Sequence, residues 1–266
     1  MRRILGIISA AMLAAMVLAS PAGAASSPDA AAWLEKVAAI HEQGPFSVDY
    51  TATLRSTQMG AQTTMEMNGK VTYGSEKHIR MVFDMKMEMP GGAGTMEMDV
   101  VSVADGETVW MSIDNPMLGG KQIMKIPIDK MEELAKSQGS AAFGGGTSMD
   151  PMSQIGTLAE KFDFDVVDDS GGKVTLEAEL TAEGLKDLPQ AQGVENLGSL
   201  YIVIDKKTNI PAEMRMGDDD PYVVMIFSNP TFHEEGSLPE DIFVFVVPEG
   251  ARVIDLGQML SGTPGY

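Results

Sequence analysis

Hydrophobic and polar residues alternate along most of this chain, and the alternation predicts β-strands. Where every second residue is apolar, one face of a strand is buried and the other meets water. The pattern recurs in stretches separated by short, glycine-containing turns, which favour antiparallel pairing. The predicted strands are Phe46–Gln58, Gln62–Tyr73, His78–Met89, Thr95–Ala104, Thr108–Ile113, Phe162–Val167, Lys173–Leu180, Leu200–Asp205, Ala212–Met216, Tyr222–Phe232 and Phe243–Pro248.

Three stretches have helical spacing instead. Ser27-Pro28-Asp29 is typical of a helix start, and the apolar residues after it, from Trp33 to His41, recur at helical intervals until Gly44-Pro45. Two shorter stripes, Ile128–Ala135 and Met152–Ala159, flank a glycine-rich stretch. These elements together predict an α+β, mainly β, fold: a strongly curved antiparallel sheet forming an open half-barrel, with a lid of about three short helices.

Methionine occupies the apolar positions of the middle strands. Nine methionines lie between Met59 and Met98, most of them at every second position, and the residues between them are polar or charged. Methionine is flexible and polarizable, so such a face can be ordinary core or a surface that adapts to an apolar ligand. A third interpretation of the methionine face is a soft-metal site for Cu(I) or Ag(I) at Met85, Met87 and Met89, if neighbouring strands bring further sulfur atoms within reach.

The first residues are typical of a secretory signal peptide. Arg2 and Arg3 precede an apolar run, Ile4–Leu18, and the small residues Ser20–Ala24 end in a cleavage pattern. We expect cleavage near Ala24, which leaves residues 25–266 as a single domain in the periplasm. No cysteine is present, so neither disulfides nor a lipidated cysteine are expected.

Charge and motifs exclude several classes of function. Without residues 1–24 the chain has 17 Lys and Arg (19 − 2) against 38 Asp and Glu, a net charge of −21, which repels nucleic acids and anionic membrane surfaces. It lacks a cysteine nucleophile, a G-x-S-x-G turn, an H-E-x-x-H motif and a phosphate-binding loop. We therefore expect a binding protein rather than an enzyme, without a cofactor.

Three segments resemble a known family in their order and spacing. They are a strand, Asp-Gly turn and aromatic-ended strand at 101–110, a strand-turn-strand at 200–211, and an aromatic closing strand with Pro248-Glu249-Gly250 at 243–255. Together they resemble the outer-membrane lipoprotein carrier (LolA-like) family. The family's latch arginine is not matched, because Tyr73-Gly74-Ser75-Glu76 stands there and the nearest basic residues are Lys77 and Arg80.

The resemblance implies a periplasmic carrier or chaperone whose apolar cavity takes acyl chains of lipoproteins or free lipid. It also implies an inner-membrane releasing transporter and an outer-membrane acceptor as partners, and we expect a monomer. An envelope-stress sensor with the same fold is an alternative. The residues expected to line the cavity are Met65, Met67, Met81, Phe83, Met85, Met87, Met96, Met98, Trp110, Met131, Leu134 and Ile155.

Overall fold

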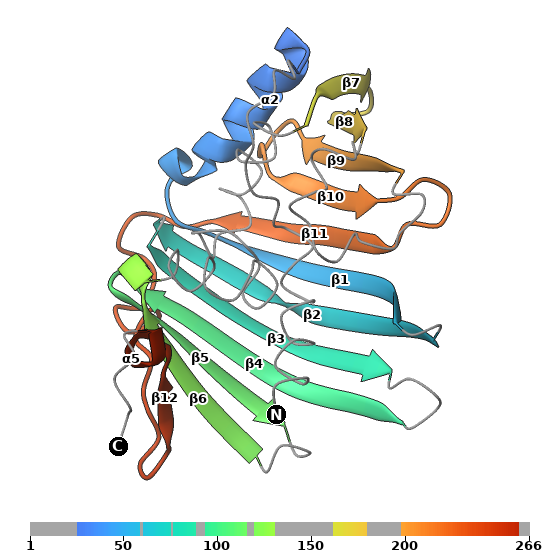
Figure 1. The fold of residues 1–266 in the computed structure, drawn as a ribbon. Coiled ribbons are helices and arrows are strands. Elements are labelled where there is room, and N and C mark those ends of the chain that lie inside the picture. Colours follow the sequence, from blue (N-terminus) through green and yellow to red (C-terminus); the bar gives the residue numbers. More distant parts are fainter. Residues whose placement is uncertain are drawn as a thin grey trace.

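A twelve-stranded sheet, bent into an open half-barrel, dominates the computed structural model (Figure 1). The structure describes residues 26–58, 61–75, 77–88, 94–115, 120–130, 162–179 and 198–260. The strand order is β12-β6-β5-β4-β3-β2-β1-β11-β10-β9-β8-β7, and the two edge strands do not meet. The predicted fold class is confirmed: a mainly β protein built on one curved, open, antiparallel sheet with a few short helices.

The sheet consists of two wings that join at β1 and β11. One wing is the meander β2 to β6 with β12 at its edge, and the other runs from β11 to β7. Neighbouring strands are antiparallel except β12, which is parallel to β6. The strands are β1 (Phe46–Gln58), β2 (Ala61–Ser75), β3 (His78–Glu88), β4 (Thr95–Asp105), β5 (Thr108–Asn115), β6 (Gly120–Pro127), β7 (Phe164–Asp168), β8 (Lys173–Glu179), β9 (Ser199–Asp205), β10 (Pro211–Met216), β11 (Val223–Phe232) and β12 (Val253–Asp255).

Local side-chain chemistry shapes the turn between β4 and β5. The Asp105 carboxylate accepts hydrogen bonds from the backbone N–H groups of Glu107, at 3.1 Å, and Thr108, at 2.8 Å. Gly106 has a φ of 99°, a conformation that L side chains rarely adopt. The Asp-Gly turn predicted from the sequence is therefore present.

Helix α2 (Pro28–Ala38) and the 3₁₀ turn η2 (Ala39–Gln43) form the predicted first helix. Ser27 precedes α2 as expected, but its side chain does not cap the helix. Its hydroxyl donates instead to the backbone carbonyl of Phe164 in β7, at 3.3 Å, and its backbone N–H donates to the same carbonyl at 2.9 Å. The start of α2 is thus attached to the edge of the second wing.

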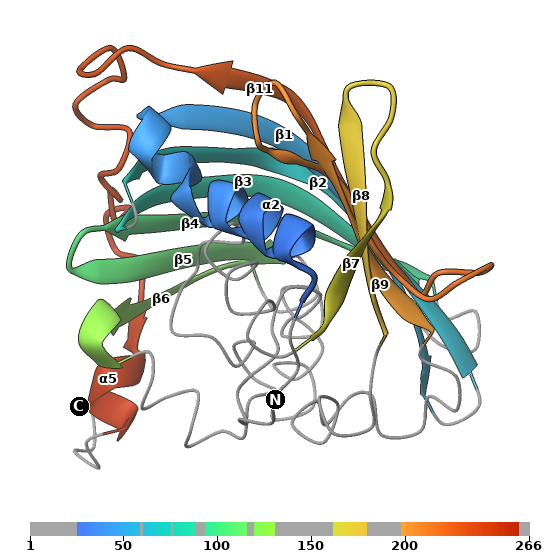
Figure 2. The ribbon, with the colours of Figure 1, turned by 90° about the horizontal axis from the view of Figure 1, so that it is seen from above.

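The concave side of the sheet is the side on which α2 and η2 lie (Figure 2). The His41 ring of η2 lies 5.7 Å from the Phe46 ring and 5.3 Å from the Tyr73 ring. We call the face of the sheet that carries Phe46 and Tyr73 the inner face, and the opposite one the outer face.

Two predictions about the strands are wrong. β6 was not expected, because Ile123 and Met124 are both buried and the period of two is broken there. Phe243–Pro248 is not a strand: it belongs to an irregular segment, residues 233–252, which we call the strap. The strap crosses the outer face and leads to β12.

The remaining helical elements are short. The turn η5 (Ile128–Lys130) contains the first residues of the predicted stripe Ile128–Ala135, and α5 (Leu256–Leu260) follows β12. The rest of that stripe, the stripe Met152–Ala159 and the predicted signal peptide lie outside the described residues. Within the part that is described, no helix is long and apolar enough to cross a membrane.

Candidate functional site: the methionine-lined inner face

The inner face is apolar across both wings. Strand register places apolar side chains, all of them buried or partly buried, opposite one another in rows that run from strand to strand, and two of these rows each cross nine strands, from β7 to β4. One row is Val166, Leu176, Ile202, Met214, Met225, Ala52, Met67, Met85 and Met98; the other is Phe164, Ala178, Leu200, Met216, Val223, Leu54, Met65, Met87 and Met96. Such a surface offers a long apolar contact to whatever covers it.

Methionine fills every position that β2, β3 and β4 contribute to these two rows. Met65, Met87 and Met96 pair directly across the three strands, and we call them the tip row because Met87 and Met96 adjoin the end of the β3–β4 hairpin and Met65 lies opposite Met87. The second row, Met67, Met85 and Met98, pairs in the same way one step further in. We call the six residues the methionine array; their exposed fractions are 1–5%.

Most of the predicted lining residues share this face. Met81 and Phe83 are buried in the adjoining rows of β3, beside the methionine array. Trp110 does not share it: its neighbours Val109 and Met111 point inward and are buried, so the Trp110 ring points outward. Met131, Leu134 and Ile155, and Met89 of the alternative metal set, lie outside the described residues.

A glycine lets two strands of the array approach closely. A Cβ atom on Gly69 would lie 2.3 Å from the Val82 carbonyl oxygen and 2.5 Å from the Phe83 Cβ atom. The Tyr50 and Phe83 rings flank this glycine in the same row and meet edge to face, with centroids 6.1 Å apart. An aromatic pair thus covers the backbone that glycine leaves bare.

The inner face carries no buried charge in the described residues. Apart from tyrosines, the buried polar side chains there and on the outer face are four hydroxyls, of Ser47, Thr72, Ser102 and Ser112. Burial, and secondarily the nearby Asp84 carboxylate, raises the pKa of Tyr50 far above its ordinary value, so its phenol stays neutral.

The outer strands of the second wing, β8 and β9, present aliphatic side chains on the inner face, whereas three methionines, Met214, Met216 and Met225, occupy it on β10 and β11. The inner positions of β8 and β9 are Val174, Leu176, Ala178, Leu200, Ile202 and Ile204, all of them buried and none of them methionine. Helix α2 is attached to β7 at this wing, and the turn η2 that follows it contacts Phe46 and Tyr73 through His41. Met65 lies eight residues along β2 from Tyr73, about 27 Å at the rise of a strand. The tip row is therefore far along β2 from the contact of η2 with Tyr73.

The strap closes the outer face of the first wing. The Phe245 ring stacks on Trp110, with centroids 5.5 Å apart and planes 2° from parallel. Phe243 lies against Gly74, where a Cβ atom would come within 2.5 Å of its ring. Arg80, one of the two basic residues nearest to the unmatched latch position, donates from Nη1 to the strap carbonyl of Ile242 at 3.3 Å. Arg80 thus holds the strap on the outer face rather than a lid on the inner one.

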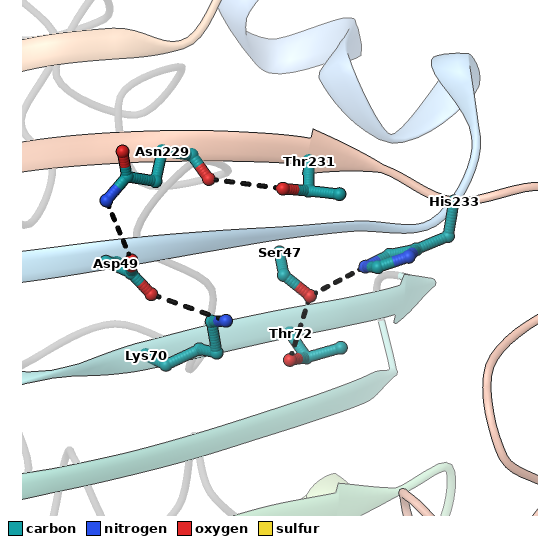
Figure 3. A network of polar contacts seen from close by, with 7 residues as sticks. All are labelled: Ser47, Asp49, Lys70, Thr72, Asn229, Thr231 and His233. Atoms are coloured by element: carbon teal, nitrogen blue, oxygen red, sulfur yellow. Dashed lines mark hydrogen bonds and ion pairs between the residues drawn. The ribbon is translucent and has the colours of Figure 1, made fainter.

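A polar network fixes the beginning of the strap (Figure 3). Ser47 Oγ lies 2.8 Å from His233 Nε2 and 3.1 Å from Thr72 Oγ1. Beside it, Asp49 accepts from Asn229 Nδ2 at 3.0 Å and pairs with Lys70 at 3.5 Å. The Ser47–His233 contact was not predictable from the sequence, because the two residues are 186 positions apart and belong to no motif.

Comparison with known proteins gives structural relatives only. No family model and no curated protein matches the sequence. LprF from Mycobacterium bovis is 15% identical with a TM-score of 0.42, over 79% of this chain and 99% of LprF. A chain of the Pseudomonas aeruginosa MucA/MucB complex is 16% identical with a TM-score of 0.39, over 82% of this chain and 61% of its own length.

A LolA superfamily protein from Nitrosomonas europaea is also similar. It is 11% identical with a TM-score of 0.28, over 80% of this chain and 96% of its own. The similar structures thus include the group that the sequence resembles. Because all these TM-scores are below 0.5, we base the function on the side chains described above.

Proposed function

We propose that this protein is a periplasmic carrier that binds acyl chains, on lipoproteins or free lipids, against its methionine-lined inner face. The observation that carries the proposal is the distribution of residue types over one continuous apolar face. Branched aliphatic side chains line β8 and β9, in the wing to which α2 is attached, whereas methionine lines β2 to β4. A fixed contact favours side chains with one preferred rotamer, and a variable guest favours flexible ones.

The energetics suit a carrier. Burial of a methylene is worth about 0.8 kcal/mol, so a long acyl chain gains on the order of 10 kcal/mol when it leaves water. An uncharged, deformable face can supply that energy without fixing one ligand geometry, which leaves release possible. The acidic exterior, in a chain with 38 Asp and Glu against 19 Lys and Arg, opposes adsorption to anionic membrane surfaces between loading and delivery.

The test is direct lipid analysis of the purified protein. We expect organic-solvent extraction and mass spectrometry to find acyl lipid, and a fluorescent fatty acid to bind to the delipidated protein. Met85→Trp, which fills the inner face, should lower fatty-acid uptake, while Met85→Leu keeps the volume and should retain it. Val82→Trp is the matched control, because Val82 lies on the same strand but faces outward, with 40% of its surface exposed. A folded wild-type protein that contains no lipid and takes up no fatty acid would refute the carrier function.

A further inference from the structure

The methionine array has a second chemical property, which is the convergence of several sulfur ligands. We propose that it binds a monovalent soft cation, Cu(I), or its analogue Ag(I), and that the tip row of Met65, Met87 and Met96 supplies three thioether ligands. This inference does not depend on acyl binding, because it uses the sulfur atoms rather than the apolar volume of the side chains.

Register brings the three sulfurs of the tip row together. Met65 is opposite Met87, and Met87 is opposite Met96. Residues opposite one another on antiparallel strands have Cβ atoms about 4.5–5.5 Å apart, which is within reach of long, flexible side chains such as methionine. Methionines two apart on one strand, such as Met85 and Met87 on β3, are about 6.7 Å apart, which is more than the separation of directly opposite residues. The tip row is therefore the more compact set of ligands.

The donor chemistry selects the metal. Thioether sulfur is a soft, neutral ligand that suits Cu(I) and gives little to Mg²⁺, Ca²⁺ or Mn²⁺, which need oxygen. In the described part of the chain, no group of three His, Asp or Glu side chains could hold a metal ion. A monovalent ion also costs less to bury than a divalent one. The array therefore favours one narrow class of cation.

Packing alone does not require methionine at these positions. In the same two rows, β8 and β9 are filled by Leu176, Ala178, Leu200 and Ile202, and these side chains are as well buried as the array. A core with the same curvature can thus be built from aliphatic residues without sulfur. On β2 to β4 the corresponding six positions are all methionine, so this part of the core contains six sulfur atoms that could act as ligands.

The tip row lies near the end of the sheet at which the β3–β4 hairpin turns. Met87 is the next-to-last residue of β3 and Met96 is the second residue of β4, so both adjoin the end of their hairpin. The residues that alternate with them on the outer face include Glu66, Glu88 and Glu97, of which Glu97 pairs with Lys86 at 3.2 Å. The acidic surface raises the local concentration of cations at this end of the sheet.

Metal titration of matched variants tests the site. Ag(I) binding is measured by calorimetry and native mass spectrometry, and Cu(I) binding by anaerobic competition with a chromophoric chelator. The variant M65L/M87L/M96L removes the tip row, and M214L/M216L/M225L removes three buried methionines from the same two rows on β10 and β11. We expect the wild type and the control to bind Ag(I) equally, and the tip-row variant to bind at least about tenfold more weakly, which corresponds to 1.4 kcal/mol. Equal loss in both variants, or no binding by the wild type, would overturn the proposal.

Two further measurements keep the result unambiguous. In wild-type protein labelled at the methionine methyl groups, Ag(I) should shift the NMR signals of Met65, Met87 and Met96 before any others; shifts confined to other methionines contradict the site. Measurement of both ligands on the wild-type protein separates the two proposals. Ag(I) binding without fatty-acid uptake supports the metal site and refutes the carrier function, and fatty-acid uptake without Ag(I) binding refutes the metal site alone.

Discussion

Replacement of Gly69 by alanine probes whether close contact between β2 and β3 maintains the methionine-lined face. The new Cβ atom would lie 2.3 Å from the Val82 carbonyl oxygen and 2.8 Å from the Phe83 Cα atom. Both obstructing atoms belong to the backbone of β3, so a side-chain rotation cannot relieve the clash. The strands must separate, and the edge-to-face pair of Tyr50 and Phe83 separates with them.

The expected cost follows from these contacts. Overpacking of a close contact costs about 1–3 kcal/mol, and the loss of an edge-to-face aromatic pair costs about 0.5–1.5 kcal/mol. Alanine also lowers the conformational entropy of the unfolded chain, which offsets about 0.4–1 kcal/mol of this loss of stability. Since the clash is with backbone, we expect Gly69→Ala to lower the free energy of unfolding by about 3 kcal/mol, near the upper end of the overpacking cost.

Urea unfolding followed by circular dichroism measures this loss. Gly171→Ala is the control: Gly171 has a φ of 59° and nothing lies within 4 Å of its Cβ position, so only the left-handed backbone costs free energy, about 1 kcal/mol. If Gly69→Ala is no more destabilising than Gly171→Ala, the close approach of β2 and β3 is not what holds this part of the sheet together. The methionine pair Met67 and Met85 is the next row, so Gly69→Ala should also weaken Ag(I) binding by the folded protein.

Three more predictions concern the outer face. A double-mutant cycle of Trp110→Ala and Phe245→Ala should give a coupling of about 0.5–1.5 kcal/mol; zero coupling would mean that the strap is not docked in solution. Ser47→Ala should cost about 1–3 kcal/mol, because the His233 ring loses its 2.8 Å partner, and an unchanged urea midpoint would contradict this. Burial raises the pKa of Asp105, but hydrogen bonds from two backbone N–H groups and the Trp110 indole outweigh burial and lower it. The stability that Asp105 contributes is then present above about pH 4, the ordinary value, and is lost as the pH falls through the lowered pKa. Asp105→Asn should flatten the pH dependence of unfolding below that pH, and an unchanged slope would show that Asp105 is not the group responsible.

The alternation of apolar and polar residues predicted the bounds of those strands well that have one solvent-exposed face. β1 has the predicted bounds, and β3 and β8 each end one residue before the predicted position. Burial alternates along β3 and β8, because their outer face is solvated. β6 lacks that signal, because Ile123 on the outer face and Met124 on the inner face are both buried.

The strap shows why alternation does not suffice to predict a strand. Phe243 and Phe245 point toward the sheet while Val244 and Val246 are 52% and 79% exposed, which is the period of a strand. The segment lies on the outer face of the sheet, however, where the backbone groups of β2 to β5 are already paired with one another. Trp110 was wrongly predicted to line the cavity because its aromatic partner, Phe245, is in the strap on the outer face. No local pattern in the sequence indicates a contact 135 positions away.

The pairing of β1 with β11 has a consequence for how this protein folds. The wing from β1 to β6 consists of hairpins between sequence neighbours, which can form early and locally. The second wing joins it along β11, where Val223 to Phe232 pair with Leu54 to Phe46 of β1, so the long stretch of chain between these two strands must be completed first. Contacts so distant in sequence slow folding. During that interval the growing hairpins present a row of thioethers to water, and the acidic side chains on their other face are what keeps one unfinished chain from associating with another.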